Sequence, residues 1–211
     1  MDGAEFHDIS VAFDATTPAW PGDTPFRCGW AWDMTQGASV NVSKWEMSPH
    51  VGTHADAPLH VRQGAAGADA LPLAPFRGAA LVVDVPSDAG ALTLAMLREA
   101  GWLPGTERLI VRTRCSTASG VFPESWPTIA PEAAVALVGE GLRLLAVDCP
   151  SVDARESTDL AVHHAIFGAG AYVLENLDLR GVEAGRYELL ALPLKVGAID
   201  AAPVRALLRA L

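Results

Sequence analysis

The sequence predicts an α/β fold, because short apolar segments with the character of buried strands alternate with segments that carry helix ends. The clearest buried strands are 79–85, 109–112 and 142–147, which are rich in branched apolar residues. One helix is expected to begin near Thr93, and a second at Pro131, a residue type that is favoured in the first turn. Strands that alternate with helices in this way are typical of the α/β class.

Further elements are expected at both ends of the chain. The amino-terminal third reads as extended segments over 6–13 and 40–47, with a loop rich in Pro and Gly between them. In the second half, the expected elements are a helix that follows Ser157 and ends at Gly168, strands over 171–175 and 187–195, and a short terminal helix that Pro203 opens. The chain is therefore predicted to be α/β with a strand-rich amino-terminal part.

Length and composition limit the kind of protein. The chain has 211 residues, and 50% of them are hydrophobic, which suits a single globular domain over 1–211. Its formal net charge of −10 disfavours nucleic acid as a partner, since phosphate binding needs clustered Lys and Arg. No apolar stretch approaches membrane-spanning length, so we expect no membrane partner.

Cysteine usage and the amino terminus indicate the compartment. Cys28, Cys115 and Cys149 are odd in number and widely spaced, unlike a disulfide framework or a CxxC metal site. They indicate a reducing environment. The amino terminus, MDGAEFHDIS, carries acids and lacks the apolar core of a signal peptide. We therefore expect a cytoplasmic protein.

The most informative feature is the run from His50 to His60, which reads HVGTHADAPLH. His50, His54, Asp56 and His60 all occupy even positions, whereas the odd positions are mainly apolar. In an extended backbone alternate side chains point to opposite faces, so the four titratable groups would lie on one side. Imidazoles and a carboxylate that are crowded together are costly without a shared cation. The run therefore predicts a metal site.

A helical interpretation of this run is disfavoured. His50 and His54 have the i, i+4 spacing of helical zinc motifs, but Gly52 and Pro58 oppose a helix. Pro58 also argues against a central strand, so we expect an edge strand that runs into a loop. His60 follows that break, and it is either a further ligand or a free acid/base beside the metal.

Two later places could complete the metal site. His163 and His164 lie on the expected third helix, where adjacent side chains point about 100° apart, so at most one faces a given site. Glu175 closes an apolar strand, and it is either a solvated strand end or a functional carboxylate. Asp56 with two histidines leaves coordination positions unfilled. Two carboxylates that can each bridge are also what a two-metal centre requires.

The loop from Thr17 to Phe26, which reads TPAWPGDTPF, holds Trp20 between prolines. Prolines on both sides stiffen the backbone, so the indole is expected to have a fixed orientation. The indole either packs as a lid on the core or forms the aromatic wall of a pocket beside the metal. The residue pattern leaves both possibilities open.

These motifs resemble a known family. The pattern His-x-Gly-Thr-His-x-Asp-x-Pro-x-His from His50 to His60 is similar to the signature of the cyclase-like metal-dependent hydrolases. The Trp-Pro-Gly-Asp-Thr-Pro motif at Trp20 is similar to that of family members that hydrolyse N-formyl-L-kynurenine in tryptophan breakdown. The resemblance covers essentially the whole chain, including 8–10, 148–151, 157–164 and 187–205. It departs at Asn176, where glycine is common, and 114–127 matches loosely.

The resemblance implies a swivelling β/β/α fold, a homodimer, and two divalent metal ions per subunit, most commonly zinc. His50, His54 and Asp56 match the ligands of one metal, and Asp56 also reaches the second. His163 matches a ligand of the second metal, and Glu175 matches a residue that contacts both. The expected cofactor is thus a binuclear centre.

The resemblance also implies a reaction. His60 matches the proton donor and acceptor, and Trp20 matches a residue that contacts the small-molecule substrate. The expected reaction is hydrolysis of N-formyl-L-kynurenine to L-kynurenine and formate. Two cations that share carboxylates supply hydroxide near neutral pH and stabilise the oxyanion, while His60 carries the proton to the leaving nitrogen.

Three other functions are compatible with these residues. A sibling hydrolase that opens a cyclic amide such as isatin would keep every ligand and change the pocket wall. A non-catalytic metal- or small-molecule-binding protein would bind metal without turnover, although the presence of His60 in addition to sufficient ligands argues against it. A structural metalloprotein would hold one tetrahedral zinc ion in a closed site.

Overall fold

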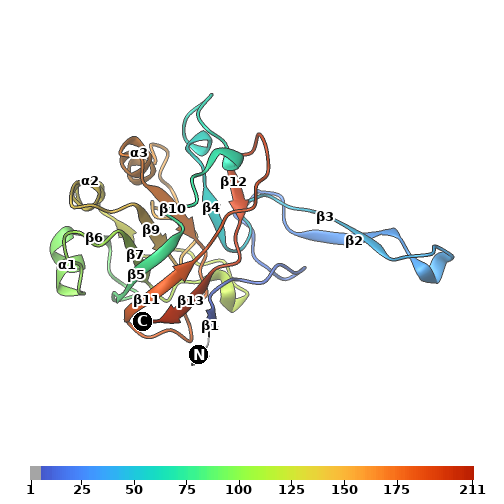
Figure 1. Ribbon diagram of the computed structural model, residues 1–211, viewed down its shortest axis with the longest axis horizontal. Helices are drawn as coiled ribbons and strands as arrows, with labels where there is room; N and C mark the ends of the chain where they lie inside the picture. Colours follow the sequence, from blue (N-terminus) through green and yellow to red (C-terminus); the bar gives the residue numbers. More distant parts are fainter. Residues whose placement is uncertain (1–5) are drawn as a thin grey trace.

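A nine-stranded mixed sheet is the framework of the structure (Figure 1). The computed structural model describes residues 6–211. The strand order is β1-β13-β11-β5-β7-β9-β10-β4-β12. In that order the bounds are Phe6–Asp8, Leu207–Ala210, Gly185–Leu190, Arg77–Asp84, Arg108–Arg112, Leu144–Val147, Tyr172–Glu175, His54–Asp56 and Ala201–Pro203.

The centre of this sheet is parallel and largely buried, which confirms the α/β prediction. β5, β7, β9 and β10 run parallel to one another and carry mainly branched apolar residues. Along β9, Leu144 and Ala146 belong to one core cluster, whereas Leu145 and Val147 belong to the other. The alternation of side chains along the strand therefore divides the core between the two faces of the sheet.

Three helices lie beside one face of the parallel strands (Figure 1). They are α1 (Leu94–Glu99), α2 (Pro131–Gly139) and α3 (Ala161–Gly168). α1 begins after Thr93, as expected, because the Thr93 hydroxyl accepts a hydrogen bond from the backbone N–H of Met96 at 3.3 Å. Within residues 6–211, no helix is long and apolar enough to cross a membrane.

Short elements connect these larger ones. The strands β6 and β8 pair in parallel and form a small separate sheet. Four single 3-10 turns, η1 to η4, occur at bends of the described chain. The bounds are Ala91–Leu92 for β6, Thr128–Ile129 for β8, Met34–Gln36 for η1, Pro58–His60 for η2, Ala68–Ala70 for η3 and Thr117–Ser119 for η4.

The sheet curls around a second core on the face that lies away from the helices. Ala55 of β4 and Leu208 of β13 lie near opposite ends of the strand order, yet they belong to the same core cluster. Such strands share a core only if the sheet bends into a half-barrel. The segment after β1 helps to close it, because the Ile9 N–H donates to the carbonyl of Ala206 and the Ile9 carbonyl accepts from the Asp178 N–H, both at 2.9 Å.

A long hairpin projects away from this body (Figure 1). It consists of β2 (Arg27–Trp32) and β3 (Val42–Glu46), with η1 near its tip. Its apolar side chains lie in solvent, and Trp30, Trp32 and Trp45 are 58%, 61% and 54% exposed. We refer to residues 27–46 as the arm.

The carboxy-terminal segment forms strands, so the short helix expected from Pro203 is wrong. Pro203 ends β12, and the residues that follow form β13, which pairs with β11 on one side and β1 on the other. A helix of this length is marginal by itself. Pairing on both sides instead gives the backbone of Leu208 its partners and buries that side chain completely. The strand expected over 187–195 likewise ends at Leu190.

β4 is an interior strand, and the edge strand expected from Pro58 is also wrong. β4 pairs with β10 on one side and β12 on the other. It has only three residues, and Pro58 lies beyond its end, where the missing N–H removes nothing from the ladder. The extended run is shorter than expected, because His50 lies in the turn before β4 and His60 lies in η2.

The turn before β4 gives a first prediction. Gly52 has φ +66°, and an added Cβ would lie 2.5 Å from Cε1 of Phe13. We expect Gly52→Ala to lower the free energy of unfolding by about 1–3 kcal/mol. It should also weaken binding of the metal that the sequence predicts, because this turn places His50 and His54. Chemical denaturation and metal titration measure the two effects.

Gly64→Ala is the matched control. Gly64 has φ +74°, and no atom lies within 4 Å of its added Cβ. The control therefore introduces the backbone strain without the contact and should leave metal affinity unchanged. Equal metal affinities in both variants and the natural chain would show that the turn does not position the histidines.

Candidate metal centre

Strand pairing and one helix bring the candidate ligand side chains together. Glu175, the last residue of β10, lies directly opposite His54, the first residue of β4. Because the two strands are antiparallel neighbours, these side chains lie on the same face of the sheet. Asp56 lies two residues further along β4 and shares this face. α3 brings buried His163 to the same place, whereas His164 is exposed.

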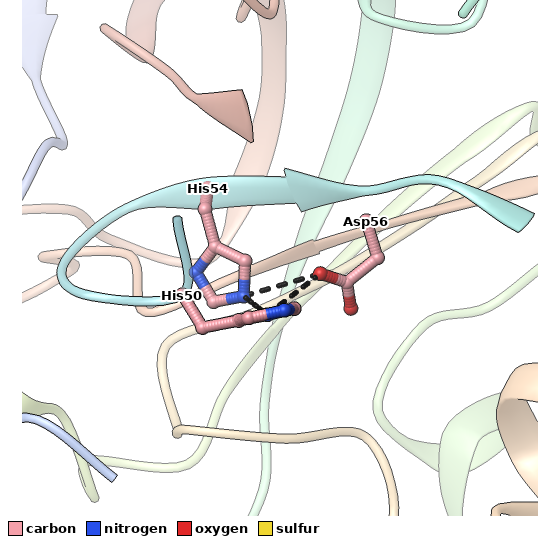
Figure 2. A group of neighbouring side chains, drawn as sticks. All are labelled: His50, His54 and Asp56. Carbon is pink, nitrogen blue, oxygen red and sulfur yellow. Dashed lines mark hydrogen bonds and ion pairs between the residues drawn. The ribbon is translucent and has the colours of Figure 1, made fainter. Parts of the chain in front are cut away.

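His50 completes a first group of ligand atoms (Figure 2). Its Nδ1 lies 3.1 Å from Nε2 of His54 and 3.2 Å from Oδ1 of Asp56, and the latter two atoms are 3.3 Å apart. A tetrahedron with bonds of about 2.0–2.1 Å has edges of about 3.3–3.4 Å. The three atoms therefore have nearly the spacing of ligands around one cation, and Figure 2 shows them pointing toward one another.

His163 forms a second group with the two carboxylates. Its Nε2 lies 3.2 Å from Oδ2 of Asp56 and 3.4 Å from Oε1 of Glu175. The other oxygen of Glu175, Oε2, lies 3.5 Å from Nε2 of His54. Each carboxylate therefore presents one oxygen to each group. Carboxylates placed in this way can bridge two cations.

The remaining nitrogen of each of these three imidazoles is anchored by an oxygen. Nδ1 of His54 lies 2.9 Å from the carbonyl oxygen of Gly52. Nδ1 of His163 lies 2.6 Å from Oδ2 of Asp153, and Nε2 of His50 lies 3.0 Å from Oδ2 of Asp200. Metal-binding histidines characteristically donate their second N–H to an oxygen in this way, which fixes the tautomer and the ring orientation.

The hydrogen bonding of one carboxylate oxygen indicates whether a cation fits these residues. Oδ1 of Asp56 is buried, and within residues 6–211 it is the one buried side-chain oxygen or nitrogen without a hydrogen-bond partner. A buried and unsatisfied carboxylate oxygen is costly. A cation between Asp56, His50 and His54 would satisfy it, so the donor set fits a divalent metal.

The pKa values of these side chains indicate that the cluster favours positive charge. Burial lowers the pKa of His50, but the hydrogen bond to Asp200 and the nearby Asp56 carboxylate outweigh burial and raise it to about 9. Burial likewise lowers the pKa of His54, but the nearby carboxylates of Asp56 and Glu175 raise it to about 10. Burial raises the pKa of Asp56, yet the neighbouring histidines hold that pKa well below its usual range.

A cavity of about 440 Å³ opens beside these residues. His54, His163 and Glu175 line it together with Trp20 and Phe122. Trp20 packs edge-on against Phe122, with ring centroids 5.5 Å apart, and also packs on the core cluster beneath the helices. Both sequence-based possibilities for Trp20 therefore hold, since it covers the core and forms an aromatic wall.

His60 lies beside the ligand atoms in the same cavity. It is half-buried, and its ring centroid lies 4.4 Å from that of His50. Its Nδ1 lies 3.2 Å from Oδ2 of Asp200. One nitrogen of His60 also lies within 4.8 Å of ligand atoms of Asp56 and His163. This position suits a proton carrier next to a metal centre.

Some residues of the site escape sequence reasoning. Asp153 and Asp200 orient histidines, but each lies in a loop and belongs to no periodic pattern. Asp153 follows the carboxyl end of β9, and ligands commonly bind at that end of parallel strands. This topological signal could have drawn attention to Asp153, whereas no comparable signal marks Asp200.

Asn176 explains a departure from the family pattern. It follows Glu175 and has φ +57°, a conformation that glycine adopts freely and asparagine adopts more readily than most residues. Its side-chain oxygen accepts a hydrogen bond from the Thr117 hydroxyl at 3.0 Å, and its carbonyl accepts one from the Thr53 hydroxyl at 2.6 Å. Asparagine therefore meets the backbone requirement that favours glycine there.

The chain resembles known proteins both in sequence and in structure. A family model described as "Putative cyclase" matches residues 7–154. A solved structure of a potential metal-dependent hydrolase with cyclase activity superposes with a TM-score of 0.83 at 26% identity, covering 97% of this chain and 96% of that one. Isatin hydrolase A from Labrenzia aggregata superposes with a TM-score of 0.81 at 24% identity, covering 98% and 93%.

Fold, ligand geometry and these matches define the class: the chain belongs to the cyclase family of metal-dependent hydrolases. This confirms the resemblance seen in the sequence. The kynurenine formamidase of Bordetella avium is 44% identical over 206 residues, which are 97% of each chain. Within the family, the chain therefore falls among the kynurenine formamidases.

The raised histidine pKa values give a second prediction. A group whose pKa is higher in the folded state stabilises the protein fully below its unfolded pKa, near 6.5, and loses that effect as pH rises through the folded pKa. The melting temperature of the metal-free protein should therefore fall between pH 6.5 and about 10. The increase in melting temperature caused by zinc should grow over the same range, because ligands bind metal when deprotonated.

Thermal unfolding of chelator-treated and zinc-saturated protein across this pH range measures both trends. Metal-free His54→Gln is the control, since it lacks one of the histidines whose pKa is raised. Its melting temperature should depend less on pH than that of the natural chain. If the melting temperatures of the metal-free and zinc-saturated proteins changed in parallel with pH, the assignment of these histidines as metal ligands would be contradicted.

Proposed function

We propose that the protein hydrolyses N-formyl-L-kynurenine to L-kynurenine and formate, using two divalent metal ions per subunit, with zinc as the proposed metal. The observation that carries the proposal is a cavity lined by His54, His163, Glu175 and Trp20, with the buried carboxylate of Asp56 in contact with both of these histidines. Similarity to kynurenine formamidases over nearly the full chain supports the substrate. Histidine and carboxylate donors suit zinc and accept other divalent ions.

The proposed ligands are divided between two sites. His50, His54 and Asp56 would hold one ion, and Asp56, His163 and Glu175 would hold the other, with Glu175 also close to the first. The chemistry that these ions supply when bound is a water of lowered pKa and stabilisation of negative charge on the formyl oxygen. The anchored histidine rings keep the ligand atoms in place before any ion arrives.

The chain's own residues supply binding and proton transfer. Trp20 lines the cavity and offers its indole to the arene of the substrate. The formyl carbon carries only a hydrogen besides its oxygen and nitrogen, so little room is needed next to the ligands. Water oxygen adds to the formyl carbon and gives up a proton to His60, the carbon–nitrogen bond breaks, and the aniline nitrogen takes that proton as formate is released. His60, with Nδ1 held by Asp200, carries that proton.

The experiment that tests this proposal follows kynurenine absorbance during hydrolysis of N-formyl-L-kynurenine by zinc-loaded and chelator-stripped protein. Turnover should require metal. His60→Gln should lower kcat by about 100- to 10,000-fold with zinc content unchanged, because proton transfer is lost while the ligands remain. His164→Gln replaces an exposed neighbour of the site and is the matched control.

Other outcomes lead to the alternatives. Metal-dependent hydrolysis of isatin without turnover of the formamide would favour a cyclic-amide hydrolase, a possibility that the fold shared with isatin hydrolase A keeps open. Bound zinc with no turnover of either substrate would indicate a binding protein. Full activity of His60→Gln would remove His60 from the mechanism.

We also propose that the protein is a homodimer whose subunits associate through the arm. Trp30, Trp32 and Trp45 expose large apolar surfaces that the rest of residues 6–211 leaves uncovered. A two-stranded hairpin is barely stable in water by itself. Two-fold pairing with a second copy would cover both arms at once. The arm base continues from the Trp20 loop through Phe26, whose ring centroid lies 6.3 Å from that of Trp45, so the partner would lie near the cavity.

Replacing all three arm tryptophans by serine should convert the dimer into a monomer, because the apolar contact is lost. Light scattering after gel filtration measures the mass, and zinc content reports that the centre stays intact. Val121→Ser with Val135→Ser removes exposed valines elsewhere and is the control. A natural chain that is monomeric, or a triple variant that stays dimeric, would contradict the proposal.

We further propose a cytoplasmic location. Cys28, Cys115 and Cys149 are free thiols. Free and widely separated thiols are typical of compartments in which they are kept reduced. Cell fractionation of the natural host with a cytoplasmic marker tests this location directly.

A further inference from the structure

One carboxylate oxygen contacts two histidines of the site. Oδ2 of Asp200 lies 3.0 Å from Nε2 of His50 and 3.2 Å from Nδ1 of His60. Strand pairing sets its position, because Ala201 of β12 lies opposite Asp56 and the Ala57 N–H donates to the Asp200 carbonyl at 2.8 Å. The side chain therefore lies directly beside the ligands of β4 although 140 or more residues separate it from either histidine.

This shared oxygen determines which nitrogen of each ring carries a hydrogen. A carboxylate only accepts hydrogen bonds, so the two ring nitrogens that face it must both be donors. In the neutral form that binds a metal, His50 then keeps a free lone pair on Nδ1, the nitrogen that faces His54 and Asp56. His60 likewise keeps Nε2 free to accept a proton. One oxygen thus prepares a metal ligand and a proton carrier together.

We infer that Asp200 is a positioning residue that fixes the tautomers of His50 and His60 and thereby couples metal binding to proton transfer. The second half of this inference rests on the proposed function, since it assigns proton transfer to His60. The other two ligand histidines have separate anchors, the carbonyl of Gly52 for His54 and the carboxylate of Asp153 for His163. In the described part of the chain, Asp200 is the residue that links the ligand set to His60.

Asp200→Ala tests both parts of the inference, the effect on metal binding and the effect on proton transfer. Asp69→Ala is the control, because it removes an exposed carboxylate from a nearby turn. Zinc affinity should fall by about 10- to 100-fold, while the number of zinc ions bound at saturation stays unchanged. At saturating zinc, kcat should fall by about 10- to 100-fold with KM unchanged. Nitrogen-15 NMR of the zinc-loaded protein should show His60 protonated at Nδ1 in the natural chain and shifted toward Nε2 in the variant.

A double variant separates positioning from a general structural role. If Asp200 acts on kcat through His60, adding Asp200→Ala to His60→Gln should lower kcat no further at saturating zinc. A further loss equal to that of the single variant would overturn the inference. Unchanged zinc affinity would overturn it as well, and so would the loss of one zinc ion at saturation, which would make Asp200 a ligand. The zinc and NMR measurements need no substrate, so they test Asp200 even if the formamide is not hydrolysed.

Discussion

The site depends on two carboxylates that the fold buries next to each other. Asp56 and Glu175 have almost no contact with solvent, and two like charges at that depth oppose folding unless positive charge balances them. The charges and hydrogen bonds around His50, His54 and His163 raise their pKa values despite burial, which favours the imidazolium form and hence a balancing positive charge in the metal-free chain. Metal ions would take the place of those protons. Neutralisation of the carboxylates is therefore a condition for packing β4, β10 and α3 together.

Strand pairing also sets the positions of the side chains in the site. β4 lies between β10 and β12, so Glu175 lies opposite His54, and Asp200 reaches the site from the loop residue that immediately precedes β12. A shift of one residue in either pairing would turn these side chains to the opposite face of the sheet. The three-residue ladder that completes the half-barrel thus also sets the distances between ligand atoms. Fold and site geometry depend on one set of backbone hydrogen bonds.

The cluster of histidines and carboxylates at the candidate metal centre could be predicted from the sequence, whereas the residues that orient these histidines could not. His50, His54 and Asp56 lie close together in the chain, and their residue types already carry metal chemistry. Asp153 and Asp200 are single carboxylates in loops, a common feature of any surface, and only the folded chain brings them to the histidines. The parallel strands were predictable because they are long apolar runs. β12 and β13 were not, because strands so short owe their stability to neighbours and not to their own pattern.

The metal ligands alone do not distinguish a formamide from a cyclic amide, since hydrolysis of either bond needs the same chemistry. Selection between substrates therefore depends on the cavity wall, where Trp20 packs edge-on against Phe122 and Trp126. Because these rings pack against one another, the wall is rigid, and a rigid aromatic wall selects substrates by their shape. Phe122 and Trp126 both lie within 114–127, the segment that matches the family pattern only loosely. Family members that share every ligand but act on different amides are expected to differ in this segment.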